Sequence, residues 1–322
     1  MKAIQINRTG GPEVLEVVEI GVPKPGEEDV VVKVETAGVN YVDVYHRDGR
    51  YAVKPPFILG QEGAGTVIAV GTGVTELKVG DRVAWTGIMG SYAEYVKLPA
   101  SRAVPVPEKI GWHEAAAAML QGMTAHYLSH DTYPLKKGDT ALVHAAAGGV
   151  GLLLVQMAHQ LGARVIGTVS TEEKAELARS AGADEIILYT QTDFEAEVHR
   201  LAPDGRVQVV YDSVGLSTFS KGLNLLSPRG MMVLFGSSSG NIPPFELGTL
   251  SQKGSLFVTR PSLAHYIATR GELLSRSRDV FDMILSGKLR LRIGHTYKLT
   301  DAAQAHKDLE GRKTTGKILL LP

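Results

Sequence analysis

The spacing of hydrophobic and polar positions changes in character near residue 114. Before it, short apolar and β-branched runs stand between glycines and prolines, which is typical of strands in a compact β domain. These strands are expected at 30–35, 65–70, 81–85 and 92–98, after an alternating first segment at 1–6. From 114 to 120 and from 123 to 129 the spacing becomes helical.

After residue 137 strands and helices alternate regularly. Strands are expected at 141–144, 164–169, 185–188, 207–211 and 231–235, and helices at 150–161, 171–181, 193–200 and 217–225. This alternation is typical of an α/β fold with a doubly wound parallel sheet, covered by helices on both faces. Beyond residue 263 follow a long helical stretch, a strand near 289–297, a helix from 301 and a strand at 317–320. We expect these last elements to return to the first domain.

Composition and charge narrow the class of protein. A chain of 322 residues favours two domains, and 44% hydrophobic with 21% charged residues is typical of a globular enzyme. Lys plus Arg and Asp plus Glu number 34 each, so no overall field attracts nucleic acid or an anionic membrane. Neither a signal peptide nor an apolar run long enough to span a bilayer is present, which predicts a cytoplasmic protein.

Metal binding is not expected. Cysteine is absent, which removes disulfides, thiol nucleophiles and thiolate metal sites. His126 and His130 stand four residues apart on a predicted helix, but the metalloprotease pattern needs a glutamate after the first histidine, and Tyr127 follows His126. We interpret both as surface or core histidines.

A glycine-rich turn at 144–151 lies between a predicted strand and a predicted helix. Ala146, Gly148 and Gly151 have the spacing of the dinucleotide fingerprint, with alanine in place of its first glycine. Small residues let the backbone approach a pyrophosphate, whose charge the helix amino end then holds. The alternative is a tight turn without a ligand, which the regular alternation disfavours.

The end of the second strand of this domain predicts NADPH rather than NADH. Enzymes that bind NAD usually place an acidic residue there to accept the ribose hydroxyl, but this chain has Ser170. A hydroxyl leaves room for a 2′-phosphate, and Lys174 lies four residues on to supply a counter-charge. The alternatives are a capping box between Ser170 and Glu173, and a solvated helix face at Lys174.

Three motifs, at 121–127, 145–151 and 211–215, together resemble the NADPH:quinone reductases, the zeta-crystallin-like, zinc-free group of the medium-chain dehydrogenase/reductase superfamily. The resemblance runs from Gly10 to Lys317. It implies a GroES-like, β-rich catalytic domain made of residues 1–122 with 266–322, and a Rossmann NADPH-binding domain at 123–265. It also implies a homodimer.

The resemblance further implies site residues. NADPH contacts are expected, by motif match, from Thr124, Gly148, Gly149, Val150, Lys174, Tyr189, Val214, Phe235, Ser238 and Arg312. The substrate side is expected to use Asn40, Tyr45 and Tyr51, with Arg260 nearby. The alternatives are a helix-cap role for Asn40, packed aromatic rings for the two tyrosines and a solvated loop at Arg312.

Gln61 stands where zinc alcohol dehydrogenases carry a zinc-binding histidine. Without zinc, the economical chemistry is hydride transfer to an acceptor that is already electrophilic, a quinone or an enone. Asn40, Tyr45 or Gln61 then hydrogen-bonds the carbonyl oxygen where negative charge develops, while the proton donor stays open. The alternatives to a quinone oxidoreductase are an enoyl or 2-alkenal reductase on the same scaffold and a non-catalytic, crystallin-like NADPH-binding protein.

Overall fold

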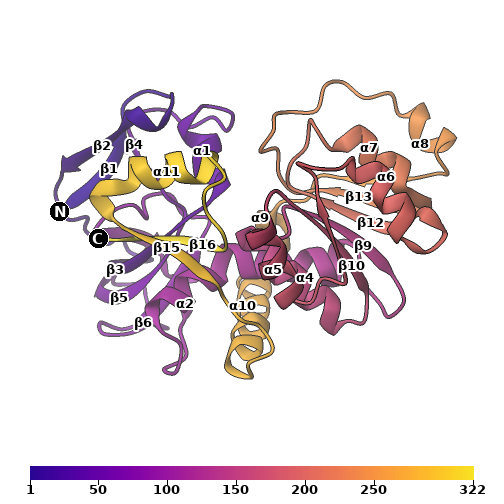
Figure 1. Ribbon diagram of the computed structural model, residues 1–322. Helices are drawn as coiled ribbons and strands as arrows, with labels where there is room; N and C mark the ends of the chain where they lie inside the picture. Colours follow the sequence, from indigo (N-terminus) through magenta and orange to yellow (C-terminus); the bar gives the residue numbers. More distant parts are fainter. The chain divides into compact units, whose positions relative to one another are not determined.

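The computed structural model describes residues 1–322 and divides into two compact units (Figure 1). Unit 1 comprises Met1–Met123 and Ile267–Pro322, and unit 2 comprises Thr124–Tyr266. These divisions fall one residue from the boundaries expected from the sequence. Both chain termini lie in unit 1, and none of the helices is both long and apolar enough to cross a membrane.

Unit 1 is built around the long strand β3 (Asp29–Val39), which pairs antiparallel with three others. These are β5 (Glu62–Val70), β7 (Tyr95–Pro99) and β16 (Lys317–Leu321), and the sheet continues through β15 (Ile293–Lys298), β6 (Arg82–Thr86) and β8 (Val104–Pro105). Ile318 of β16 pairs with Val39 at the end of β3. The last strand of the chain therefore lies beside the residues that follow β3.

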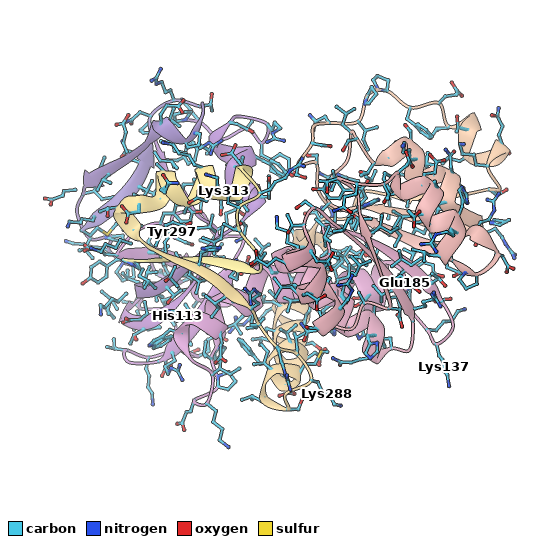
Figure 2. All side chains as sticks on the ribbon, viewed as in Figure 1. His113, Lys137, Glu185, Lys288, Tyr297 and Lys313 are labelled. Atoms are coloured by element: carbon cyan, nitrogen blue, oxygen red, sulfur yellow. The ribbon has the colours of Figure 1, made fainter.

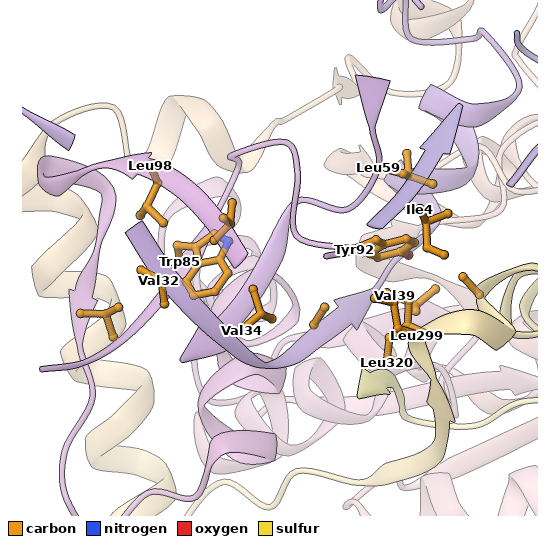
Figure 3. Packing of buried hydrophobic residues seen from close by; sticks show 14 of the residues in the cluster. Ile4, Val32, Val34, Val39, Leu59, Trp85, Tyr92, Leu98, Leu299 and Leu320 are labelled. Atoms are coloured by element: carbon orange, nitrogen blue, oxygen red, sulfur yellow. The ribbon is translucent and has the colours of Figure 1, made fainter. Parts of the chain in front are cut away.

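A smaller sheet and four helices complete unit 1. The sheet has the order β2 (Leu15–Glu19), β1 (Lys2–Ile6), β4 (Phe57–Ile58), and the helices are α1 (Tyr41–Arg47), α2 (Trp112–Ala117), α10 (Arg270–Leu285) and α11 (Ala302–Glu310). Figure 3 shows the core, where Val32 and Val34 of β3 lie near Trp85 of β6. The sequence did not predict β2 or α1, because short elements rich in exposed or aromatic residues carry little periodicity.

Unit 2 is a six-stranded parallel sheet, which confirms the predicted doubly wound architecture. Its order is β11 (Glu185–Leu188), β10 (Arg164–Val169), β9 (Thr140–His144), β12 (Val207–Asp212), β13 (Leu226–Leu234) and β14 (Phe257–Thr259). The crossover helices are α4 (Gly149–Gln160), α5 (Glu172–Ser180), α6 (Phe194–Leu201) and α7 (Phe219–Leu225). Because parallel crossovers are right-handed, α4 with α5 and α6 with α7 cover opposite faces.

The carboxyl and amino ends of the strands in this sheet differ. The strand order reverses between β9 and β12, and in such sheets ligands bind at the carboxyl ends of the strands beside the reversal. At the amino ends, Arg164 and Glu185 form an ion pair at 2.8 Å, and Lys137 extends into solvent (Figure 2). The carboxyl ends of the strands are therefore the expected place of a cofactor site.

Helical structure between α2 and β9 is irregular. The predicted helices at 114–120 and 123–129 form one run that includes two π-helical turns, Ala118–Gly122 and Leu128–Thr132, on either side of α3 (Met123–Tyr127). In a π turn the amide bonds shift by one residue, and such turns are frequent at functional sites. The first of them contacts a buried glutamate of unit 1, described below.

Candidate active site

The glycine-rich turn joins β9 to α4 at the carboxyl edge of the unit 2 sheet. Its first residue, Ala145, has a positive φ of 54°, and α4 begins after Gly148 without a side-chain cap. A Cβ on Gly148 would lie 3.1 Å from the Ala145 oxygen, and one on Gly151 would overlap it. Small residues are therefore required here, and the first amides of α4, which include those of Gly149 and Val150, have no partner within the helix. This arrangement fits an anionic pyrophosphate.

Ser170 and Tyr189 directly follow β10 and β11, and Lys174 lies in the first turn of α5. Lys174 Nζ donates to Ser170 Oγ at 3.2 Å, and the Tyr189 amide donates to the Val169 oxygen at 3.2 Å. Thr190 Oγ1 donates to the Ser170 oxygen at 2.9 Å, which ties the two strand ends together. A cation and hydroxyls occupy the place where an NAD site has a carboxylate, so these residues fit a 2′-phosphate.

The predicted capping box between Ser170 and Glu173 is wrong. The cap of α5 is Thr171, whose hydroxyl accepts from the Lys174 amide at 3.3 Å. The helix begins one residue later than expected because threonine is also a good N-cap. Where two capping residues are adjacent, the geometry of the turn determines which of them caps the helix. Ser170 is therefore not engaged in capping.

Asp212 organises the loop after β12, a role that the sequence did not reveal. Its buried carboxylate accepts from the amides of Val214 at 2.7 Å and Gly215 at 3.0 Å, and from the Thr218 hydroxyl at 2.7 Å. These bonds fix the backbone at Val214, one of the expected NADPH contacts. The sequence signal that could have revealed it is an acidic residue at the end of a predicted strand, directly before a glycine-containing turn.

His144, at the end of β9, is buried beside these loops. Its Nδ1 lies 2.9 Å from Thr168 Oγ1, while its Nε2 has no partner. Burial lowers the pKa of His144, and the nearby Asp212 charge opposes this only in part. The ring is therefore neutral and adds no charge beneath the glycine turn.

The remaining expected residues of unit 2 lie near other strand ends. The Phe235 amide donates to the Asp212 oxygen at 2.9 Å, and the Ser238 amide donates to the Ser213 oxygen at 3.2 Å. Arg260, directly after β14, donates to the Leu234 oxygen at 3.1 Å. Thr124 is buried at the start of unit 2. Arg260, expected on the substrate side, thus belongs to the unit that carries the expected cofactor contacts.

In unit 1, Asn40 lies between β3 and α1 and is nearly fully buried, at 4% exposure. It occupies the cap position of α1, but its amide turns away from the helix and donates to Glu62 Oε2 at 2.8 Å. Its oxygen accepts from Lys317 Nζ at 2.8 Å and from Gln121 Nε2 at 3.2 Å. Asn40 therefore occupies the N-cap position of α1, but its side chain makes no capping hydrogen bond.

Glu62 and Lys317 form a buried ion pair beside Asn40, with exposures of 0% and 2%. The other oxygen of Glu62 accepts from the Leu120 amide, at 2.5 Å, in the first π turn. Gly38 makes room for the pair, because a Cβ there would overlap Glu62 Oε2 and lie 2.7 Å from Lys317 Nζ. The sequence signal that could have revealed this pair is a charged residue directly before each of two apolar runs, at 63–70 and 318–321.

A second buried chain of hydrogen bonds runs from α11 to α1. Arg47 pairs with Glu310 at 2.7 Å, and because a guanidinium only donates, His306 Nδ1 accepts from it at 3.1 Å. His306 Nε2 then carries the proton and faces the Tyr92 oxygen at 3.2 Å. Tyr92 donates to Asp43 at 3.0 Å. Burial and then the Arg47 charge lower the pKa of His306 to about 3, so this ring is neutral.

Asp43 ends this chain next to the Asn40 backbone. Its Oδ2 accepts from the backbone N–H of Asn40 at 2.8 Å, while its Oδ1 is buried without a partner. Burial raises the pKa of Asp43 to about 7, against the lowering effect of the bonds from Asn40 and Tyr92 and of the Lys317 charge; Glu62 adds to the rise. The carboxyl is thus the titrating group of this region near neutral pH.

Tyr45 and Tyr51 form an aromatic pair on α1 and the loop after it. Their ring centroids lie 5.3 Å apart in an edge-to-face arrangement, and Arg50 stacks over Tyr45 at 4.3 Å. Tyr45 is buried and Tyr51 is 42% exposed. The packed-aromatic alternative therefore fits Tyr45, whereas Tyr51 offers an exposed ring for a ligand.

Gln61 and Arg312 are the other expected residues of unit 1. Gln61 lies directly before β5, and its backbone oxygen accepts from the Gly87 amide at 2.8 Å. Arg312 follows α11, is exposed and has a positive φ of 56°. Unlike the other expected cofactor contacts, Arg312 belongs to unit 1.

The chain contains no cluster of three histidine, cysteine, aspartate or glutamate side chains arranged to hold a metal ion. His126 and His130 do share one helix face, as their spacing predicts. Their rings stack in parallel with centroids 4.2 Å apart.

Two family models match separate segments of this chain. A family model described as alcohol dehydrogenase GroES-like domain matches residues 26–108, and one described as zinc-binding dehydrogenase matches residues 149–276. Quinone oxidoreductase of Pseudomonas aeruginosa is 46% identical, over 100% of this chain and 99% of the relative. A 2-haloacrylate reductase of a Burkholderia species is 43% identical, over 99% and 98%. The crystal structure of Escherichia coli quinone oxidoreductase complexed with NADPH has a TM-score of 0.98 at 43% identity, with 100% of both chains covered.

Proposed function

Because the chain belongs to the quinone oxidoreductase family of the medium-chain dehydrogenase/reductase superfamily, we propose that it transfers a hydride from NADPH to a quinone without a metal ion. The observation that carries the proposal is the buried Asn40 amide. Its oxygen is occupied by two donors and its nitrogen gives one hydrogen to Glu62, so a single N–H is left for a substrate. That group complements a carbonyl oxygen.

Unit 2 supplies residues that fit NADPH. The amides at the start of α4 suit its pyrophosphate, and Lys174 with Ser170 and Tyr189 suits its 2′-phosphate. Thr124, Val214, Phe235 and Ser238 would line the rest of the cofactor. When bound, the cofactor supplies the hydride from its nicotinamide ring.

Unit 1 supplies the residues for the acceptor. The exposed ring of Tyr51, packed on Tyr45, suits the face of a flat quinone. The remaining N–H of Asn40 donates to the carbonyl oxygen as negative charge develops there, with Gln61 as a second candidate donor. The proton that completes the reduction comes from solvent.

An enone is the second candidate acceptor. A relative at 43% identity is named 2-haloacrylate reductase, which places an activated alkene among the substrates found on this scaffold. The same Asn40 N–H would meet the carbonyl oxygen of an enone. The geometry of unit 1 therefore suits both classes of acceptor.

The test is a panel of quinones and enones assayed with NADPH and with NADH, each with and without a strong chelator. We expect reduction of quinones with NADPH at rates that chelation leaves unchanged. Faster turnover of enones would select the second candidate. Binding of NADPH without turnover of any acceptor would support a non-catalytic, crystallin-like protein, and loss of activity with loss of bound zinc would contradict metal-free chemistry.

We further propose that the protein is a homodimer that associates through β14. This strand pairs only with β13, so its other edge is open, and its Phe257 is 56% exposed. An open edge strand with an exposed aromatic residue is suited to pairing with a second copy. Light scattering that shows a monomer at micromolar to millimolar concentration would contradict the proposal.

A further inference from the structure

The neighbours of Asn40 leave its amide only one orientation. Lys317 has three donors and no acceptor, and an ionised Glu62 has acceptors only. The Asn40 oxygen therefore faces Lys317, and its nitrogen faces Glu62, each at 2.8 Å. Reversal of the amide would set N–H against the ammonium and oxygen against the carboxylate. Two unfavourable contacts would replace two charge-assisted hydrogen bonds.

The ion pair itself is held from four parts of unit 1. Glu62 begins β5 and Lys317 begins β16, which lie on either side of β3. The Leu120 amide in the π turn donates to the second oxygen of Glu62, so that the carboxylate cannot rotate freely. The missing side chain of Gly38 creates the space for both charged groups.

We propose that Glu62 and Lys317 are positioning residues of the reaction, which fix the Asn40 amide so that its free N–H is the group offered to the substrate oxygen. The inference rests on the proposed function and extends it to specificity. The carbonyl oxygen of a hydride acceptor can accept a hydrogen bond from the Asn40 N–H. The Asn40 side chain offers no acceptor to the O–H of an alcohol, because both lone pairs of its oxygen are occupied.

The experiment compares four proteins: wild type, Asn40→Ala, Glu62→Gln/Lys317→Met, and the triple variant. The paired change removes both charges together, because a single change leaves the other charge buried and unpaired. The glutamine introduced by Glu62→Gln would then offer an N–H to the Asn40 oxygen, and the Asn40 amide would lose its fixed orientation. For each protein, kcat and KM for a quinone are measured with the dissociation constant for NADPH and the thermal midpoint.

We expect Asn40→Ala to lower kcat roughly 100-fold, as loss of one oxyanion donor does, and Glu62→Gln/Lys317→Met to lower it roughly 10- to 100-fold. In the Asn40→Ala background the paired change is expected to add less than about twofold, because residues that act as one unit are not additive. NADPH affinity should stay the same throughout. A merely structural ion pair would instead give losses that multiply.

A control is Arg47→Met/Glu310→Gln, which neutralises a second ion pair of unit 1 and leaves the three side-chain hydrogen bonds of Asn40 in place. This pair reaches the Asn40 backbone only through His306, Tyr92 and Asp43, so kcat should stay within about twofold of wild type. An equal fall of kcat in this control would overturn the inference, as would additive losses. If the paired variant does not fold, Gln121→Ala removes the weaker donor to the Asn40 oxygen and keeps both charges. Its expected loss, about two- to fivefold, must vanish in the Asn40→Ala background.

Failure of the proposed function gives a different result. A wild type that reduces no quinone or enone overturns the function and this inference together. If Asn40→Ala keeps the wild-type kcat, the carbonyl contact at Asn40 is wrong and the positioning role falls with it. Loss of kcat in Asn40→Ala with additive loss from the ion pair overturns the inference alone.

Discussion

The two units hold their candidate site residues in opposite ways. In unit 2 the partners are close in sequence: Lys174 bonds Ser170 four residues away, and Thr218 bonds Asp212 six residues away. In unit 1 Asn40 bonds Glu62, Gln121 and Lys317, which lie 22, 81 and 277 residues away. Ser170 and Lys174 are partly exposed beyond the end of a strand, whereas Asn40, Glu62 and Lys317 are buried. Substitution of Asn40, Glu62 or Lys317 should therefore affect folding and chemistry together, whereas substitution of Ser170 or Lys174 should affect binding alone.

The largest expected difference between the units is in stability. Lys317→Met leaves the Glu62 carboxylate buried without its cation, which should lower the free energy of unfolding by about 3–5 kcal/mol. Lys174→Ala, at a partly exposed site, should change it by no more than about 0.5 kcal/mol. Both tryptophans, Trp85 and Trp112, lie in unit 1, so denaturation followed by tryptophan fluorescence reports that unit. Because this probe does not sense unit 2, Lys174→Ala also needs a circular-dichroism melt.

Ser170→Asp should produce the largest change in cofactor preference. The new carboxylate would pair with Lys174, repel a 2′-phosphate and accept from the ribose hydroxyls of NADH. The ratio of kcat/KM for NADPH to that for NADH is expected to fall roughly 100- to 1,000-fold. Steady-state kinetics with both cofactors measure it. A ratio that stays at the wild-type value would mean that the end of β10 does not contact the ribose.

Lys174→Ala should have a smaller effect of the same kind. It removes a charge-assisted hydrogen bond worth about 1.5–3 kcal/mol, so NADPH should bind roughly 10- to 100-fold more weakly. NADH, without the 2′-phosphate, should bind as before. Lys137→Ala is the matched control, because this lysine projects into solvent at the amino ends of the strands (Figure 2). Equal weakening of both cofactors in Lys174→Ala would contradict the phosphate contact.

The same contrast explains which features the sequence could predict. The strand ends, the glycine turn and the position of Lys174 beside Ser170 depend on local spacing, and the structure has them where the sequence placed them. The capping box at Ser170 failed because two capping residues stand side by side. The choice between them depends on the path of the turn, which local composition does not determine.

Local sequence patterns could not predict the ion pair beside Asn40. Glu62 and Lys317 meet because β5 and β16 both pair with β3, and the register of those pairings is a property of the folded sheet. Gln121 joins them through a π turn, whose hydrogen-bond shift has no clear sequence signature. Asn40 itself was found only through a family resemblance, and its partners needed the structure.

A pH dependence distinguishes two titrating groups within unit 1. Folding raises the pKa of Asp43 from 3.8 to about 7, so its contribution to stability is complete below pH 3.8 and is lost as the pH rises towards 7. Folding lowers the pKa of His306 from 6.5 to about 3, so its contribution is complete above pH 6.5 and is lost as the pH falls towards 3. Between pH 3.8 and 6.5 the two effects oppose each other.

Asp43→Asn should isolate the effect of Asp43. Asparagine can still accept from the Asn40 amide and the Tyr92 hydroxyl, but it does not titrate. The difference in unfolding free energy, variant minus wild type, should therefore rise by about 1.4 kcal/mol per pH unit between about pH 4.5 and 6.5. Denaturation followed by tryptophan fluorescence at three pH values measures it, and titrations elsewhere cancel in the difference. Parallel profiles would mean that Asp43 is already ionised in the folded protein across this range, with Lys317 rather than burial deciding its charge.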